Sequence, residues 1–230
     1  MQRSSKRKKI TEKDNFSYLL FSLIFLLFSS AAIDHLLVRS FTGQSLIIAL
    51  TILSMCIAVW SMRSSAFAFS TGISIVISTL VIATIVIVLD RADLEFIHLI
   101  LMIVFFLATL KPACQQALFS GTITANNIIG SICIFLLLGL IWALLYLLLL
   151  EFSPSSFSGL DGVSWKENLP DTIYFSFVTL TTLGFGEILP TAPIARFLVY
   201  MEAIVGVFYM AIVVSSLVGA GINDSHHTKV

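Results

Sequence analysis

The segment that decides the fold lies near the carboxyl end of the chain, where residues 170–193 read PDTIYFSFVTLTTLGFGEILPTAP. Pro170 followed by Asp171 is a typical helix start. The apolar run from there to about Thr181 would extend only about 18 Å at helical rise, whereas the hydrocarbon core of a bilayer is about 30 Å thick. The segment therefore predicts a helix that enters a membrane and ends halfway, with the negative end of its dipole at the bilayer centre.

Two glycines follow this short helix, one on each side of Phe185. Gly184 and Gly186 permit backbone conformations that other residues avoid, so that successive carbonyl oxygens can face the same way. Such oxygens can replace the hydration shell of a bare ion. One short loop cannot surround an ion, but four identical chains around one axis would supply four loops, which predicts a fourfold homo-oligomer. The alternative interpretation is a tight glycine turn between two packed helices, with no ion.

The composition of the whole chain is that of a membrane protein. Of its 230 residues, 58% are apolar and 11% are charged, and the mean hydropathy is +1.01. These values exclude a soluble globule, because soluble domains carry about 25% charged residues. Basic and acidic residues balance at 13 each, which gives no support for nucleic-acid binding, and the three cysteines form no CxxC metal pair. We expect no cofactor, and no cluster of catalytic side chains indicates an enzyme.

Charge-free runs locate the helices that would cross the membrane, because each crossing needs about 20 apolar residues. The runs cover residues 16–33, 40–62, 64–89, 96–110 and 128–150, and a last, largely apolar span covers residues 193–218. Pro112 is expected to end the fourth span. The pattern predicts an all-α integral membrane fold with six transmembrane helices and one re-entrant helix. For the first run the alternative is a secretory signal, since a basic segment precedes it.

The same runs divide the chain into parts. We assign residues 1–15 to a basic tail, 16–111 to a four-helix membrane domain, 112–127 to an interfacial linker, 128–221 to a pore domain and 222–230 to a short tail. Basic residues are concentrated in the amino-terminal tail, between Arg3 and Lys13, so we expect this end in the cytoplasm. Six crossings would bring the carboxyl end to the same side, and we expect the chain in the cell membrane (plasma or inner). Acidic residues collect on the opposite face, where they would attract cations.

Residues 182–187, Thr-Leu-Gly-Phe-Gly-Glu, resemble the TVGYGD filter of tetrameric potassium channels, and the resemblance extends over about residues 128–221. It implies that backbone carbonyls and a threonine oxygen bind dehydrated K+. The ion-binding residues would be Thr182, Leu183, Gly184 and Phe185, with Gly186 closing the filter. Residues around the filter would support it, namely Tyr174, Phe175, Val178, Thr181 and Glu187.

The resemblance also assigns roles on the last helix. Gly206 stands at the spacing from the filter at which the family has the glycine hinge of its pore-lining helix. Apolar residues at helical spacing below it would line a cavity that gates by dewetting. These are Val207, Met210, Val214 and Val218. Ordinary helix packing is the alternative for each of them.

Several positions differ from the family pattern. Phe185 replaces the usual Tyr and lacks its hydroxyl, so we expect the filter to be braced by apolar packing on Phe175. Glu187 replaces Asp, and we expect it to accept a hydrogen bond from Tyr174. Val178 stands where some relatives keep a buried acid, so we expect no carboxylate pair behind the filter.

The remaining ionisable residues bear on gating. The fourth span contains no Arg or Lys between residues 96 and 110, so steep voltage dependence is not expected. Glu202, in the last span, is interpreted as a structural partner of Arg196 rather than as a pH sensor. The function implied is passive K+ conduction by a homotetramer in contact with membrane lipid, and a separate regulatory subunit is a candidate partner. The alternatives are a weakly selective monovalent cation channel, and a transporter or non-conducting subunit.

Overall fold

The computed structural model describes residues 15–37, 41–61, 66–89, 95–118, 124–160 and 164–227. Within these ranges the chain forms long α-helices, one short 3₁₀ helix at Pro154–Ser156 and two strands of two residues each. The α-helices are α1 (Asn15–Leu37), α2 (Phe41–Ser61), α3 (Ala66–Leu89), α4 (Glu95–Leu118), α5 (Ala125–Phe152), α6 (Trp165–Leu180) and α7 (Pro193–His227). The strands are β1 (Phe157–Ser158) and β2 (Leu189–Pro190). The predicted all-α class is confirmed, whereas residues 1–14 of the predicted basic tail lie outside the described part of the chain.

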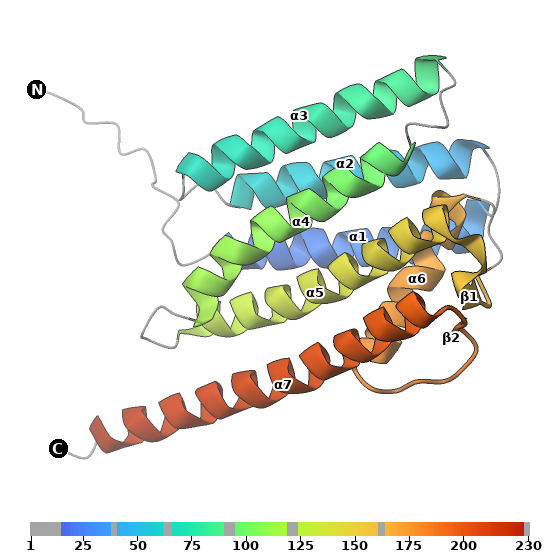
Figure 1. Cartoon of the computed structure of the whole chain (residues 1–230). Coiled ribbons are helices and arrows are strands. Elements are labelled where there is room, and N and C mark those ends of the chain that lie inside the picture. Colours follow the sequence, from blue (N-terminus) through green and yellow to red (C-terminus); the bar gives the residue numbers. More distant parts are fainter. Residues whose placement is uncertain are drawn as a thin grey trace, which may run out of the picture.

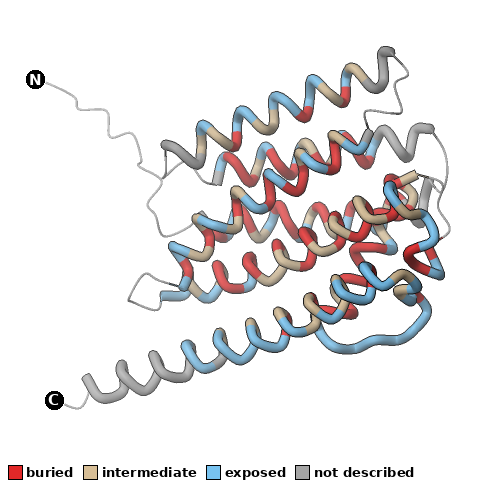
Figure 2. The backbone as a smooth tube through the Cα atoms, viewed as in Figure 1, coloured by how far each residue is buried: buried red, intermediate tan, exposed pale blue. Residues whose placement is uncertain are grey.

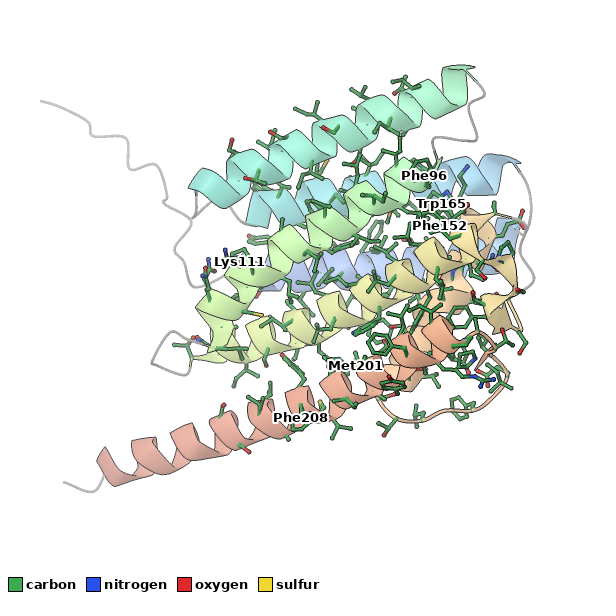
Figure 3. All side chains as sticks on the ribbon, in the orientation of Figure 1. Phe96, Lys111, Phe152, Trp165, Met201 and Phe208 are labelled. Atoms are coloured by element: carbon green, nitrogen blue, oxygen red, sulfur yellow. The ribbon has the colours of Figure 1, made fainter. Side chains whose placement is uncertain are left out.

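The long helices form an alternating bundle. Helices α1 to α5 and α7 run up and down in turn, so that α1 begins and α7 ends at the same end of the molecule (Figure 1). Lys111 lies at that end, whereas Phe96, Phe152 and Trp165 lie at the other (Figure 3). Helix α6 and the two strands are also at this second end.

Four of the described helices are long and apolar enough to cross a membrane. Their apolar segments are Phe16–Ile33, Phe96–Leu118, Ala125–Phe152 and Pro193–Val213. Within α2 and α3 the structure describes shorter apolar segments, Leu46–Trp60 and Phe69–Ile85. The chain is therefore a helical membrane protein with at least these four candidate spans.

Helix α5 is the centre of the bundle. It packs against α1, α4, α6 and α7. Its side chains are buried on most of its circumference, and Figure 2 shows the helix largely in red and tan. Leu137, Ala143 and Leu147 are fully buried. Because α5 touches both the amino-terminal helices and α6, it connects these two parts of the molecule.

Helix α4 does not end at Pro112, as the sequence predicted, but continues through this proline to Leu118. A proline removes one helical hydrogen bond, and neighbouring helices can compensate for the loss. Here Ala113 and Ala117 are buried, and the side-chain amide of Asn127 donates hydrogen bonds to the carbonyls of Gln116 (3.3 Å) and Ala117 (3.1 Å). The last turn of α4 is thus capped by α5, which only the packed structure provides.

Candidate functional site

A small antiparallel ladder joins the end of α5 to the start of α7. Phe157 of β1 pairs with Pro190 of β2, and the backbone N–H of Thr191 donates to the carbonyl of Ser156 at 2.9 Å. Gly159 is required here, because its φ is +87° and an added Cβ would lie 2.4 Å from the carbonyl oxygen of Glu187. The chain therefore leaves this ladder after Ser158 and comes back to it at Leu189, so both ends of the intervening segment lie at the same end of the bundle.

Helix α6 begins at Trp165, and not at Pro170 as the sequence predicted. The N–H groups of Glu167 and Asn168 donate to the carbonyl of Ser164, which starts the helix before the proline is reached. Pro170 then removes only one hydrogen bond near the start of the helix. With 16 residues α6 is about 24 Å long, which is still shorter than a bilayer core of about 30 Å.

The carboxyl end of α6 lies at the middle of the bundle. An added Cβ at Gly139, midway along α5, would lie 2.6 Å from the ring of Phe177. An added Cβ at Gly206 of α7 would lie 2.1 Å from the carbonyl oxygen of Leu180, the last residue of α6. Both glycines permit a close approach that a larger residue would block. For Gly206 this is a packing role that the sequence alone did not indicate, and its role as a hinge stays a prediction.

The backbone after α6 has an alternating conformation. Thr182, Gly184 and Gly186 have φ values of +61°, +56° and +93°, whereas Leu183 and Phe185 between them are not in this region. A β-branched residue at positive φ is a rare and strained case. Nothing lies within 4 Å of a Cβ added at Gly184 or Gly186, so conformation rather than space calls for glycine at these positions.

The start of this segment is hydrogen-bonded to α6, and the whole segment is exposed in the single chain. The N–H of Leu183 donates to the carbonyl of Val178 at 2.9 Å, and the N–H of Thr182 donates to that of Thr179 at 2.9 Å. The hydroxyl of Thr181 donates to the carbonyl of Phe177. All residues from 181 to 187 are exposed, and Leu183 and Phe185 are 62% and 68% exposed. The single chain thus leaves two large apolar side chains and irregular backbone uncovered.

The residues expected to support the filter do not all make the contacts that the sequence predicted. The hydroxyl of Tyr174 donates a hydrogen bond to the Glu187 carboxylate, and this bond raises the pKa of Tyr174 above its usual value. Phe175 is buried, with its ring 5.3 Å from that of Tyr146 and 5.8 Å from that of Phe157. The expected packing of Phe185 on Phe175 is therefore not formed within this chain, because α6 turns Phe175 toward α5 and β1. Val178 is buried as well.

A buried polar cluster lies behind α6. Glu202 of α7 has no exposed surface, and its carboxyl group is hydrogen-bonded to the hydroxyl of Tyr146 from α5 and to that of Ser176 from α6. The expected pairing of Glu202 with Arg196 is wrong, since the Arg196 guanidinium donates to the carbonyl of Pro190 at 3.2 Å. The reason is geometric, because α7 presents these two residues to different neighbours.

Sequence reasoning missed Tyr146 and Ser176. The signal was present, since an ionisable residue in a membrane span calls for a polar partner from a neighbouring helix. Both partners are hydroxyl residues on helices that pack against α7. From Val178 we expected no carboxylate pair behind the filter. A single carboxyl group does lie behind α6, and it comes from Glu202 on α7.

A cavity of about 630 Å³ lies below the segment and between α5 and α7. It is lined mostly by apolar side chains, and Thr181, Thr182 and Gly206 form part of its wall. Val207 and Met210 both line it, but it lies between two helices of one chain, so their predicted place in the wall of a central pore stays a prediction. The side chains of Val214 and Val218, predicted for the same role, lie outside those that the structure describes.

A comparison with known protein families gives a match in the part of the chain that contains α6 and the segment after it. Residues 130–222 match the sequence model of a family described as "Ion channel". No curated protein and no solved structure shows a significant match to the chain. The matched residues include nearly all of α5, all of α6, the alternating segment and α7 as far as residue 222. Residues 130–222 are therefore similar to the ion channel family, over less than half of the chain.

Proposed function

We propose that the chain conducts K+ passively through a pore formed by four copies, each of which contributes residues 182–186 to a common selectivity filter. The observation that carries this proposal is the alternation of positive φ at Thr182, Gly184 and Gly186. A strained backbone of this kind costs about 1–3 kcal/mol for each non-glycine residue and persists mainly at functional sites. It is also a conformation in which successive carbonyls can face one axis and replace the water around an ion.

The position of α6 supports the same proposal. Residues 159–188 leave and re-enter one end of the bundle, and α6 ends beside Gly139 at the middle of α5. We therefore propose that α6 is a re-entrant pore helix whose negative dipole end faces the middle of the pore. A cation that has lost part of its hydration at this depth would be stabilised there.

The exposed backbone supports a fourfold assembly. Residues 181–187 are uncovered in the single chain, and irregular backbone at membrane depth is tolerated only where it is buried in protein or lines a water-filled cavity. Lipid cannot meet this condition, whereas further copies of the chain can. Exposed apolar side chains on α7 would contact those copies or lipid, among them Ile204, Phe208 and Ile212. Members of the ion channel family are in general oligomeric and embedded in lipid.

We further propose six crossings, made by α1 to α5 and α7, with both termini in the cytoplasm. The alternation of these helices supports this count, since it brings the start of α1 and the end of α7 to one end (Figure 1). The basic residues near the amino terminus support the orientation in a plasma membrane. A helix α4 without a ladder of basic residues supports gating by something other than voltage, such as the dewetting of the cavity beside Val207 and Met210.

The proposal is tested with the purified full-length protein in liposomes. Uptake of Rb+ without an energy source is expected, and reversal potentials in K+ against Na+ are expected to show a strong preference for K+. G184A is expected to abolish uptake, because alanine is strained at a φ of +56°. The control is S78A on α3, since the Ser78 hydroxyl donates to the Ser74 carbonyl of the same helix.

Three results would contradict the proposal. Equal permeability of K+ and Na+ would favour a weakly selective cation channel instead. Saturating flux that depends on a counter-ion would favour a transporter. Continued flux through G184A, with the oligomer intact, would remove residues 182–186 from the ion path.

A further inference from the structure

We propose that Glu202 is a positioning residue for the filter, and that it acts as a neutral carboxylic acid linking α7 to α6 through Tyr146 and Ser176. This inference rests on the proposed function, because its main readout is ion selectivity. It goes beyond that function by assigning a role to a cluster that touches neither the ion nor the cavity.

The proton count in the cluster indicates the neutral acid. The Ser176 hydroxyl lies 2.7 Å from the carbonyl oxygen of Gly139 and 2.5 Å from Oε1 of Glu202. A carbonyl can only accept and a serine has one hydroxyl hydrogen. One hydroxyl hydrogen forms one full hydrogen bond, so both contacts are satisfied when Ser176 donates to Gly139 and a protonated Glu202 donates to Ser176. The Tyr146 hydroxyl then donates to Oε2, and each of the three contacts has one proton.

The surroundings of Glu202 agree with this count. Its partners Tyr146 and Ser176 are uncharged hydroxyl groups, and Tyr146 is the titratable residue that α5 places on it. Arg196, the basic residue in the first turn of α7, bonds to Pro190 instead. An ionised carboxylate buried without a cation would be very costly, whereas a hydrogen-bonded carboxylic acid is tolerated.

The cluster is connected to the filter through α6. Ser176 lies two residues before Val178, whose carbonyl accepts the N–H of Leu183 at 2.9 Å and that of Gly184 at 3.4 Å. One turn after Glu202, Gly206 brings α7 against the carbonyl of Leu180. A change at Glu202 would thus be transmitted to the first carbonyls of the filter by a short chain of bonds.

A purely structural role does not require an acid at this position. Replacing a buried polar or ionic group by a well-packed apolar side chain is often neutral or stabilising. The acid is therefore better explained by a requirement for directed hydrogen bonds at this point. Tyr146 is fully buried and its ring packs 5.3 Å from those of Phe157 and Phe175, so that its hydroxyl is held in place.

The experiment compares E202Q, E202L and S176A in the reconstituted full-length protein. Glutamine can accept from Tyr146 through its oxygen and donate to Ser176 through its nitrogen, so E202Q is expected to keep the K+ to Na+ permeability ratio of the wild type. E202L and S176A are expected to lower the ratio about tenfold, the effect of about one hydrogen bond lost next to the filter. The matched control for S176A is S22A, since Ser22 is equally buried but bonds only to Leu19 of its own helix.

A second readout does not depend on transport. The infrared spectrum of the wild type is expected to contain the carbonyl band of a buried protonated carboxylic acid, and this band is expected to be absent from E202Q. If the band is missing from the wild type, or if E202Q loses selectivity as E202L does, the acid is not neutral and the inference is wrong.

The outcomes separate this inference from the proposed function. An unchanged permeability ratio in both E202L and S176A would show that the cluster does not position the filter. Loss of selective flux already in the wild type would contradict the proposed function, while the infrared band would still decide the protonation of Glu202. If E202L does not assemble, the permeability ratio of S176A still tests the inference, because S176A removes only one hydroxyl group.

Discussion

Helices α5 and α7 are both long and apolar, yet the chain buries them very differently. In the apolar segment of α5 that could cross a membrane, 56% of the residues are buried inside the chain, against 11% in the corresponding segment of α7 (Figure 2). Phe208 of α7, labelled in Figure 3, is 64% exposed. The comparison shows that one chain completes the surroundings of α5 but leaves those of α7 and the filter segment to other molecules.

The largest expected effect comes from the point where α7 meets α6. G206V would place a branched side chain against the Leu180 carbonyl, which lies 2.1 Å from an added Cβ and belongs to the backbone. We expect destabilisation of more than about 3 kcal/mol and no ion flux, because a backbone group cannot move aside as a side chain can. Denaturation followed by circular dichroism, together with Rb+ uptake, measures this. Normal flux through G206V would show that α7 does not need this contact.

The next test compares the two helices directly. L137A, at a fully buried site on α5, is expected to lower the stability of the chain in detergent by about 2 kcal/mol through the cavity it leaves. I212A, at a site on α7 that is 57% exposed, is expected to leave that stability nearly unchanged. Its effect is expected on the oligomer, measured as earlier dissociation in native mass spectrometry at rising detergent concentration. Equal effects of the two variants on the chain would contradict the comparison.

A smaller effect is expected where α6 rests on α5. G139A would bring a Cβ within 2.6 Å of the Phe177 ring, which can shift only in part. We expect a loss of about 1–2 kcal/mol, because the conflict is with a side chain and not with backbone. The thermal unfolding midpoint of G139A measures it, with G206V as the reference. A larger loss in G139A than in G206V would reverse the order expected for the two glycines.

The smallest effect is expected at the outer end of the filter. Y174F removes the hydroxyl that donates to Glu187. Both groups are exposed in the single chain, so we expect normal assembly and a modest fall in the K+ to Na+ permeability ratio, smaller than that of S176A. Reversal potentials of the two variants measure the difference. An effect of Y174F larger than that of S176A would place the main support of the filter at Glu187 and not at Glu202.

Local features predicted much of the structure. Charge-free runs located the long helices, since each crossing needs a continuous apolar stretch, and the two glycines located the segment with positive φ. The predictions at the two prolines were wrong, because Pro112 and Pro170 lie inside helices. The end of α4 beyond Pro112 is capped by Asn127 of α5, and α6 begins before Pro170 is reached, so neither proline ends its helix.

Alone, the sequence determined that this is a helical membrane protein with a short helix followed by Gly184 and Gly186, because hydropathy and glycine conformation are local properties of the chain. Only the tertiary structure decided that Glu202 bonds to Tyr146 and Ser176 rather than to Arg196, and that Gly206 lies against Leu180. Those contacts join residues from three helices. They depend on how the helices pack and rotate against one another, which is set by the summed shape of many side chains and not by any one segment.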